Sequence, residues 1–248
     1  MFQALSGPDS ADPRTSSRPL KPYTLARKNA LRGLKIGLDP DFGLNDADPP
    51  MRAVMNAALA TLRGLGATLV TVRFPDRAEL FDTLLTIAGQ EAIDYKNPVA
   101  AAASAPDPAQ YQHAVAWRGR LSREVAALLD RIDVLLTPAV PAALLPAAGM
   151  DQLESDPELF RKTLRYVIPF DLTGSPALVL PAGFNEAGGP VAVQFVAQRF
   201  REDVLLQVGY AFEQATQWHR RHPRLDLEQS ALVRAASRYS QPPGQHPS

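Results

Sequence analysis

The 248-residue chain contains no cysteine, so disulfides, thiolate nucleophiles and cysteine-ligated zinc sites are all excluded. It also has no net charge, with 26 basic and 26 acidic residues, whereas a nucleic-acid binder needs a standing cationic field. No apolar run is long enough to span a bilayer, and the first 30 residues lack the apolar core of a signal peptide. We therefore expect a cytoplasmic protein that binds neither nucleic acid nor membrane.

Signatures of metal and phosphate sites are scarce. Among the four histidines, His219 and His222 have a spacing that can chelate, but no acidic third ligand stands nearby. Cationic side chains at a helix end also complement the helix dipole, which gives this pair an ordinary structural explanation. The chain contains neither GxGxxG nor GxxxxGK[ST], the usual nucleotide-binding loops. We expect no metal and no cofactor.

The two ends differ from the middle of the chain. Residues 1–30 are rich in proline, serine and charge and predict an irregular arm. The first 35 residues hold seven basic residues against Asp9 and Asp12, so the arm either docks on a partner or lies solvated near the acidic body. Residues 229–248 predict a disordered tail. The ordered domain is expected over 31–228.

Between these ends, strands alternate with helices, which predicts an α/β fold. Leu34, Ile36 and Leu38 alternate as in a strand, and Asp48 is a candidate N-cap for the helix that follows the loop 39–50. With the next strand, over 67–73, these elements form a βαβ unit with a parallel pair. Further helices are expected over 51–65, 78–97, 108–131, 157–168 (ended by Pro169) and 202–220, and further strands over 133–137, 177–180 and 191–196.

No residue qualifies as a catalytic nucleophile. The chain has no GxSxG motif, and the pair Ser16-Ser17 near Lys21 lies in the irregular arm. Such an arm cannot hold a catalytic group within the narrow tolerance that catalysis requires. We therefore assign no catalytic residue in this chain.

The segment 169–183 has an unusual pattern of a Thr-Gly before a proline, a short apolar run and a second proline. Thr173 and Gly174 would place a hydroxyl and backbone amides at the entrance of a strand, where ligands often bind. The alternative is a buried turn without a ligand. The sequence alone leaves both interpretations open.

Several short segments follow one another in a characteristic order over most of the chain. They are Gly7-Pro8-Asp9, Leu31–Gly37, Asp133–Pro138, Phe170–Ala177, Pro181–Gly183, Pro190–Gln194 and the helix that begins at Glu202. No single segment is specific, but their order and spacing resemble the second half of amidase-signature enzymes. The chain is identified as the C-terminal half of an amidase-signature fold.

The resemblance implies a mixed β-sheet covered by helices on both faces and a hydrolase that cleaves amide C–N bonds. In that family a lysine, a serine in a cis peptide and a nucleophilic serine perform the chemistry, and no residue of this chain matches any of them. The resemblance also implies a wall for a small amide substrate. Its residues are Phe170, Asp171, Thr173, Gly174, Ser175 and Pro176.

Three hypotheses about function follow from the resemblance. The first is a truncated amidase that is inactive alone, because the Ser-Ser-Lys triad is missing. The second is a C-terminal half that assembles with a separately encoded catalytic half. The third is a non-catalytic ligand-binding module. In the first two cases the uncovered seam predicts that the isolated chain associates with itself or with a partner.

Overall fold

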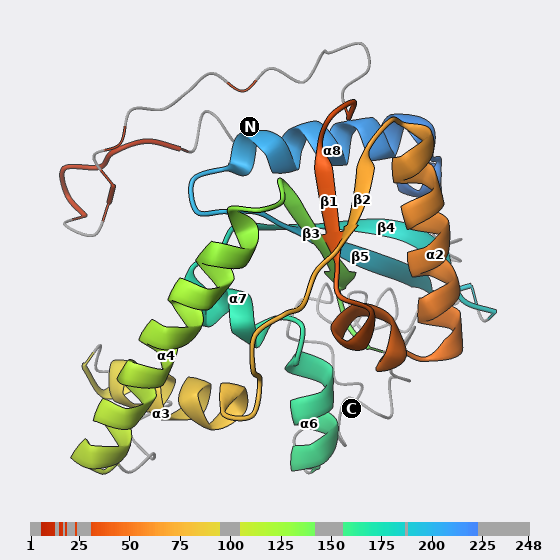
Figure 1. Ribbon diagram of the computed structural model, residues 1–248. Coiled ribbons are helices and arrows are strands. Elements are labelled where there is room, and N and C mark those ends of the chain that lie inside the picture. The colour runs from red at the N-terminus through yellow and green to blue at the C-terminus, as the bar shows by residue number, and fades with distance from the viewer. Residues whose placement is uncertain are drawn as a thin grey trace, which may run out of the picture.

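The computed structural model of the chain (Figure 1) describes residues 6–12, 15, 16, 18, 23, 31–94, 105–141, 156–186 and 188–222. The predicted tail 229–248 and most of the predicted arm 1–30 lie outside the described residues. The division into an arm, a half-domain over 31–228 and a tail therefore stays a prediction.

A five-stranded sheet forms the centre of the described structure, with the strand order β2-β1-β3-β5-β4. β1, β2 and β3 are parallel, whereas β5 runs antiparallel to both β3 and β4. The sheet is therefore mixed, as the family resemblance implies. The strands are β1 (Lys35–Leu38), β2 (Thr68–Thr71), β3 (Val134–Pro138), β4 (Ala177–Phe184) and β5 (Pro190–Val196).

The predicted βαβ unit is confirmed. Helix α2 spans Pro49–Gly64 between the parallel strands β1 and β2. Asp48 caps this helix, since its carboxylate accepts a hydrogen bond of 2.8 Å from the backbone N–H of Met51. The two prolines after the cap occupy the first helical positions, where a missing N–H has no intrahelical partner to lose.

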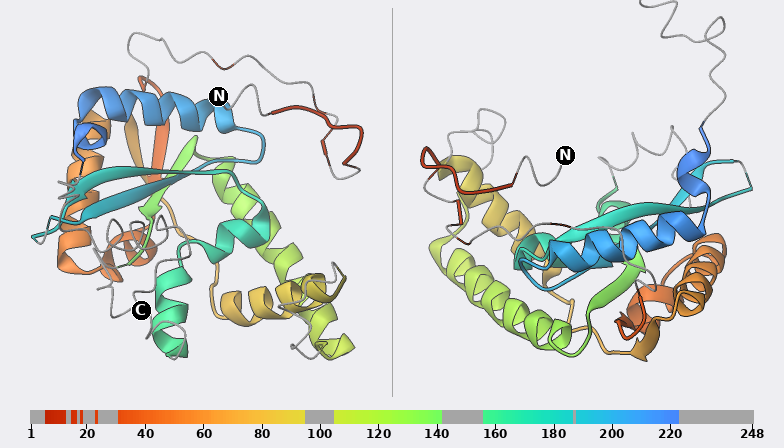
Figure 2. Two further views of the ribbon diagram at one scale, coloured as in Figure 1. Left: turned by 180° about the vertical axis from the view of Figure 1, so that it is seen from behind. Right: turned by 90° about the horizontal axis from the view of Figure 1, so that it is seen from above.

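Helices cover both faces of this sheet, as expected (Figure 2). One core contains Val134 and Leu136 of β3 and lies under α2 and α8, and the other contains Leu135 and lies under α3, α4 and α7. β3 contributes to both cores because side chains alternate along a strand, and all of its residues are buried. The bounds are α3 (Leu80–Asp94), α4 (Pro108–Leu129), α7 (Ile168–Thr173) and α8 (Glu202–Ala215).

The prediction of one helix over 157–168 is wrong at its C-terminal end. The structure has a shorter helix, α6 (Pro157–Leu164), and a separate helix α7 that begins at Ile168. Pro169 lies in the first turn of α7, so this proline starts a helix although the sequence pattern predicted that it ends one. The fixed φ of proline suits the first turn of a helix, which explains the difference.

Two further boundaries differ from expectation. The predicted helix 202–220 ends at Ala215, and a single 3₁₀ turn, η3 (Trp218–Arg220), follows it. His219 and His222 therefore do not share the end of one α-helix. The predicted loop 39–50 contains a π-helical turn, η1 (Asp41–Asn45). The Asp39 carboxylate stabilises this turn, because it accepts hydrogen bonds from two backbone N–H groups at its start.

Candidate functional site

The segment singled out in the sequence forms α7 and the turn that leads into β4. Directly after α7, Gly174 adopts the left-handed conformation with φ 64°. The Ser175 N–H donates to the Phe170 carbonyl at 3.1 Å, and the Gly174 N–H donates to the Asp171 carbonyl at 3.4 Å. These bonds form a Schellman motif, after which a proline prevents further helix. The Thr-Gly-Ser-Pro sequence therefore terminates α7.

An open cavity of about 400 Å³ lies beside this turn; we call it the α7–α8 cavity. Its lining combines five of the six predicted substrate-binding residues with three residues from the loop after β5 and the start of α8. The end of α7 and the start of α8 thus meet at one hollow. The lining residues are Phe170, Asp171, Gly174, Ser175, Pro176, Arg199, Phe200 and Glu202.

Thr173, the sixth predicted residue, does not line the cavity. Its side chain is buried, and its Oγ1 lies 2.8 Å from the Oγ of Ser175. Of the two alternatives for this segment, Thr173 fits the buried turn, because it packs beneath the turn; its role in substrate binding stays a prediction. Thr173 instead holds the Ser175 hydroxyl, whose bonded partner is another hydroxyl and not a base. Among the described residues, no base is hydrogen-bonded to this serine, so none of them activates it as a nucleophile in this arrangement.

The cavity contains two carboxylates and one guanidinium, from Asp171, Glu202 and Arg199. Desolvation by burial raises the pKa of the Asp171 carboxyl above its ordinary value. The Arg199 guanidinium lies over Gly174, where an added Cβ would be 3.7 Å from its Cζ. The hollow therefore offers both signs of charge.

Three lining residues, Arg199, Phe200 and Glu202, were not predicted from the sequence. Phe200 is the one non-glycine residue with a left-handed φ, 65°, in the part of the chain that the structure describes. A bulky side chain rarely adopts this conformation, and no local sequence signal predicts it here. The ring is 46% exposed at the cavity. The sequence did indicate that Glu202 begins a helix, because acidic residues favour the first turn of a helix.

Residues of the N-terminal arm reach the same corner. The Arg18 guanidinium lies over the Phe200 ring, with its Cζ 4.6 Å from the ring centroid. Tyr23 lies near Glu202 and Asp203: desolvation by burial raises the pKa of its hydroxyl, and these two carboxylates raise it further. Of the two alternatives for the arm, these described residues support contact with the acidic body.

A buried hydrogen-bond network supports α7 from below. The side-chain amide of Gln194, on β5, donates to the Tyr166 carbonyl at 2.9 Å and to the Thr137 hydroxyl at 3.1 Å. Thr137 lies directly opposite Gln194 on β3, and Tyr166 precedes α7 by two residues. Gln194 therefore joins two central strands to the helix that carries the cavity wall.

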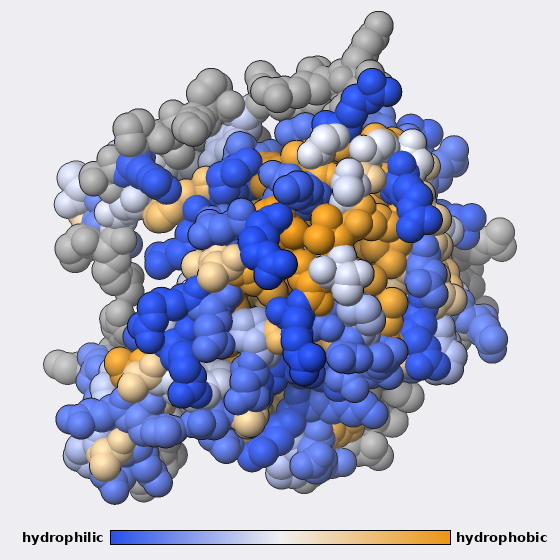
Figure 3. Space-filling view, in the orientation of Figure 1, coloured by the Kyte–Doolittle hydropathy of each residue, from blue (hydrophilic) through white to orange (hydrophobic). Residues whose placement is uncertain are grey.

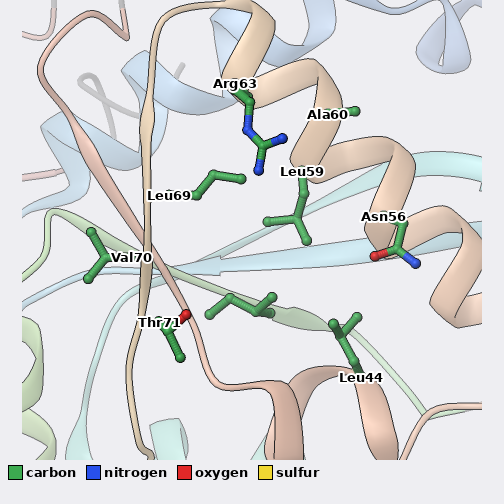
Figure 4. Close-up of a pocket in the computed structure, with 9 residues that line it drawn as sticks. Leu44, Asn56, Leu59, Ala60, Arg63, Leu69, Val70 and Thr71 are labelled. Atoms are coloured by element: carbon green, nitrogen blue, oxygen red, sulfur yellow. The ribbon is translucent and has the colours of Figure 1, made fainter.

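A second hollow lies at the other edge of the sheet. Apolar residues gather there between β2 and α2 (Figure 3), and Leu59 and Leu69 lie on its two sides while Arg63 extends over it (Figure 4). We call it the α2–β2 groove. Its lining contains no acid, histidine or serine that could transfer a proton or attack a substrate. The α2–β2 groove is therefore a poor candidate for a catalytic site.

Metal ligands do not gather in the part of the chain that the structure describes. Within those residues, no three acidic or histidine side chains come together as a metal site. His113 pairs with Glu79 at 2.5 Å on the exposed surface of the α3–α4 region. None of the described helices is both long and apolar enough to cross a membrane.

Sequence comparison connects the chain to amidases. The family model described as Amidase matches residues 1–106 and 96–206. An amidase of Pseudomonas putida is 30% identical, over 91% of this chain and 52% of its own length. A glutamyl-tRNA(Gln) amidotransferase subunit of Geotalea daltonii is 28% identical, over 91% of this chain and 54% of its own length. The chain spans about half the length of the curated relatives it matches.

Solved structures show the same fold. A glutamyl-tRNA(Gln) amidotransferase subunit from Thermotoga maritima has a TM-score of 0.73 and 23% identity, and the match covers 87% of this chain and 50% of that one. Native peptide amidase from Stenotrophomonas maltophilia has a TM-score of 0.69 and 25% identity, with 91% of this chain and 52% of that one covered. The family model, the relatives and the fold agree: this chain belongs to the amidase family, the amidase-signature enzymes.

Proposed function

We propose that the chain forms the substrate wall of an amide-hydrolysing enzyme. The observation that carries the proposal is the α7–α8 cavity, where five of the six wall residues expected from the family resemblance line one hollow. The Arg199 guanidinium lies over Gly174 at the wall, and Ser175 presents a polar side chain that Thr173 holds in place. The proposed substrate is a small amide whose acyl group enters this cavity.

The nucleophile, its cis-peptide serine and its lysine come, in this proposal, from a segment outside these 248 residues. Ser175, the serine that lines the α7–α8 cavity, is bonded to a hydroxyl and to no base among the described residues. Removal of a serine hydrolase's nucleophile or base lowers the rate by about 10⁴–10⁶. The chain without that segment is therefore inactive, whether the segment belongs to the same polypeptide or to a separate one. The cytoplasmic location stays part of this proposal.

The test uses the DNA next to the coding sequence of this chain in its source genome. We expect it to encode a lysine and a Gly/Ser-rich loop, in the same frame, a neighbouring frame or a separate gene. Expression of both parts together should give amide hydrolysis. Hydrolysis by the chain alone, lost when one of its own serines is changed, would contradict the proposal.

Ser175 provides a finer test in the active complex. Ser175→Leu enlarges and depolarises the wall, so it should shift preference among acyl groups by about tenfold, the effect of one or two methylenes in a pocket. Ser175→Ala keeps the space and removes only the hydroxyl, which separates polarity from size. Equal losses for all substrates, with a lowered melting temperature, would show that the turn is only structural.

The non-catalytic module is the second candidate. It is favoured by the same observation that Ser175 lacks a base, because a cavity without a nucleophile can still bind a ligand. It predicts that the chain alone binds a small amide and that no neighbouring catalytic segment is encoded.

A further inference from the structure

The α2–β2 groove has the size and lining of a binding site for a small molecule. Its volume is about 460 Å³, which lies within the range of roughly 300–1,000 Å³ that is usual for ligand pockets. Most of its lining is apolar and comes from four separate elements, β1, η1, α2 and β2. The apolar lining residues are Leu38, Leu44, Leu59, Ala60, Leu69 and Val70.

The leucines form the floor of this groove. Leu59 is buried, whereas Leu38, Leu44 and Leu69 are half-buried and still meet water. In Figure 4, the side chains of Leu59 and Leu69 lie in the space between α2 and β2. Removal of such apolar surface from water is favourable, so the floor favours a ligand with an alkyl part.

A positive charge lies over this floor. The Arg63 side chain leaves the last turn of α2, and its guanidinium extends over the groove between Leu59 and Leu69 (Figure 4). The guanidinium makes no hydrogen bond or ion pair with any residue that the structure describes. A cation at this end of a helix complements the helix dipole, but a guanidinium turned toward water would do so equally well. Its position over the leucines therefore needs a further explanation.

The polar part of the lining suits an anion. α2 and β2 contain no acidic residue, and no acidic residue lines the groove. The other polar lining residues are Asn56 and Thr71, whose amide and hydroxyl can both donate hydrogen bonds. Donors and one cation thus surround a floor of alkyl side chains. The complementary ligand has a carboxylate at one end of an alkyl chain.

We propose that the α2–β2 groove binds an aliphatic carboxylate, with its alkyl chain on the leucine floor and its carboxylate at the Arg63 guanidinium. This site does not depend on the proposed function, because the groove and the α7–α8 cavity share no lining residue. β1, β3 and β5 separate β2 from β4. At about 4.8 Å per strand, these two edges of the sheet lie roughly 19 Å apart. A ligand in the groove therefore leaves the cavity empty.

Octanoate is the probe for this site, and the full chain is the protein. The methyl signals of Leu59 and Leu69 in NMR spectra report the groove alone, so binding elsewhere does not interfere. Octanamide has the same alkyl chain without the charge and should bind at least about fivefold more weakly, because a charged acceptor makes the stronger hydrogen bond. Butanoate keeps the charge on a shorter chain and should bind at least about tenfold more weakly.

Arg63→Gln tests the proposed carboxylate contact. The variant keeps a polar side chain and removes the charge, so it should weaken octanoate binding at least about fivefold and make octanoate and octanamide bind alike. Arg52→Gln is the matched control, because Arg52 is exposed on the same helix but does not line the groove. It removes the same charge and should change binding by less than about twofold.

Ala60→Phe tests the leucine floor. Ala60 is exposed on α2 and lines the groove, so a phenylalanine there would cover the floor without entering the core. This variant should bind octanoate at least about tenfold more weakly, because the alkyl chain loses its apolar contact. Circular dichroism and a melting temperature check that all three variants fold.

Several results would overturn the proposal. They are Leu59 and Leu69 signals that octanoate leaves unmoved, equal binding of octanoate and octanamide by the unchanged chain, and equal losses for Arg63→Gln and Arg52→Gln. A dimer of the chain alone that Ala60→Phe dissociates would assign the groove to a second copy. A peptide of alternating leucine and glutamate that binds more tightly than octanoate would assign it to a partner protein. Either result would also overturn the proposal, whereas loss of the proposed amide hydrolysis would leave it unaffected.

Discussion

Replacement of Gln194 by leucine should destabilise the protein through the loss of two buried hydrogen bonds. The Gln194 side-chain amide is buried and donates to the Tyr166 carbonyl and to the Thr137 hydroxyl, at 2.9 and 3.1 Å. Leucine is similar in size but cannot donate. The Tyr166 carbonyl would remain buried beside α7 without this donor, and the Thr137 hydroxyl would lose the same partner.

The expected magnitude follows from these two bonds. A buried group left without its partner costs about 1–3 kcal/mol, and a lost bond to a hydroxyl costs about 1 kcal/mol. Gln194→Leu should therefore lower the free energy of unfolding by about 2–4 kcal/mol. A domain with about 5–15 kcal/mol of stability remains folded after such a loss. With a urea m-value of about 2 kcal/mol/M, the midpoint should fall by roughly 1–2 M.

Urea unfolding followed by circular dichroism measures this effect, and Gln198→Leu is the matched control. Gln198 follows β5 and donates to Asp130 at 2.9 Å on the exposed surface, and at 3.4 Å to the Ala126 carbonyl. Loss of these weaker, wetter bonds should cost less than about 1 kcal/mol. A loss below about 0.5 kcal/mol for Gln194→Leu, or equal losses for both variants, would refute the view that Gln194 holds α7 to the sheet.

Two further predictions concern the α7–α8 cavity. At Phe200, with φ 65°, Phe200→Gly should be more stable than Phe200→Ala by about 1 kcal/mol, the reverse of the usual order, because both lose the ring and only glycine relieves the strain. The usual order in thermal melts would contradict this. Burial raises the pKa of the Asp171 carboxyl, so the stability cost of its charge is present above the folded-state pKa and absent below the ordinary value of 3.8. Asp171→Asn should raise the free energy of unfolding at pH 7 by no more than about 0.5 kcal/mol, because solvent screens this exposed group. At pH 3 the substitution should leave the stability unchanged. Equal gains at pH 3 and pH 7 would disprove the linkage.

Local signals predicted much of the fold. The Asp-Pro-Pro sequence at 48–50 indicated the start of α2, because a capping carboxylate and proline act within one turn. Alternating apolar residues indicated β1, β-branched residues indicated β2, and the helix between them indicated the parallel βαβ unit. These features depend on neighbours in the sequence, so a single chain is enough to identify them.

Features set by distant contacts could not be predicted. The π-helical turn at 41–45 depends on Asp39, whose carboxylate also accepts from the backbone N–H of Phe74, 35 residues further along the chain. Phe200 adopts its left-handed φ where the loop after β5 meets α8, although its own type disfavours it. Arg199 and Glu202 join the cavity only because α7 and α8 come together at one corner.

The candidate site was predicted in part. The family resemblance selected the segment 170–176, and five of its six named residues line the α7–α8 cavity. Thr173 is buried beneath the turn, and its role in substrate binding stays a prediction. A pattern of residue types marks a helix end but does not say which side chain faces inward, and the Thr173–Ser175 hydroxyl contact decides this here.

Amide turnover by this chain, alone and together with the catalytic segment, tests the central claim most directly. We predict no turnover above background for the chain alone, because no base is hydrogen-bonded to Ser175 among the described residues. Turnover should be at least about 10⁴-fold faster for the two parts together, the loss expected when a serine hydrolase lacks its nucleophile. Equal rates with and without the catalytic segment would contradict the claim.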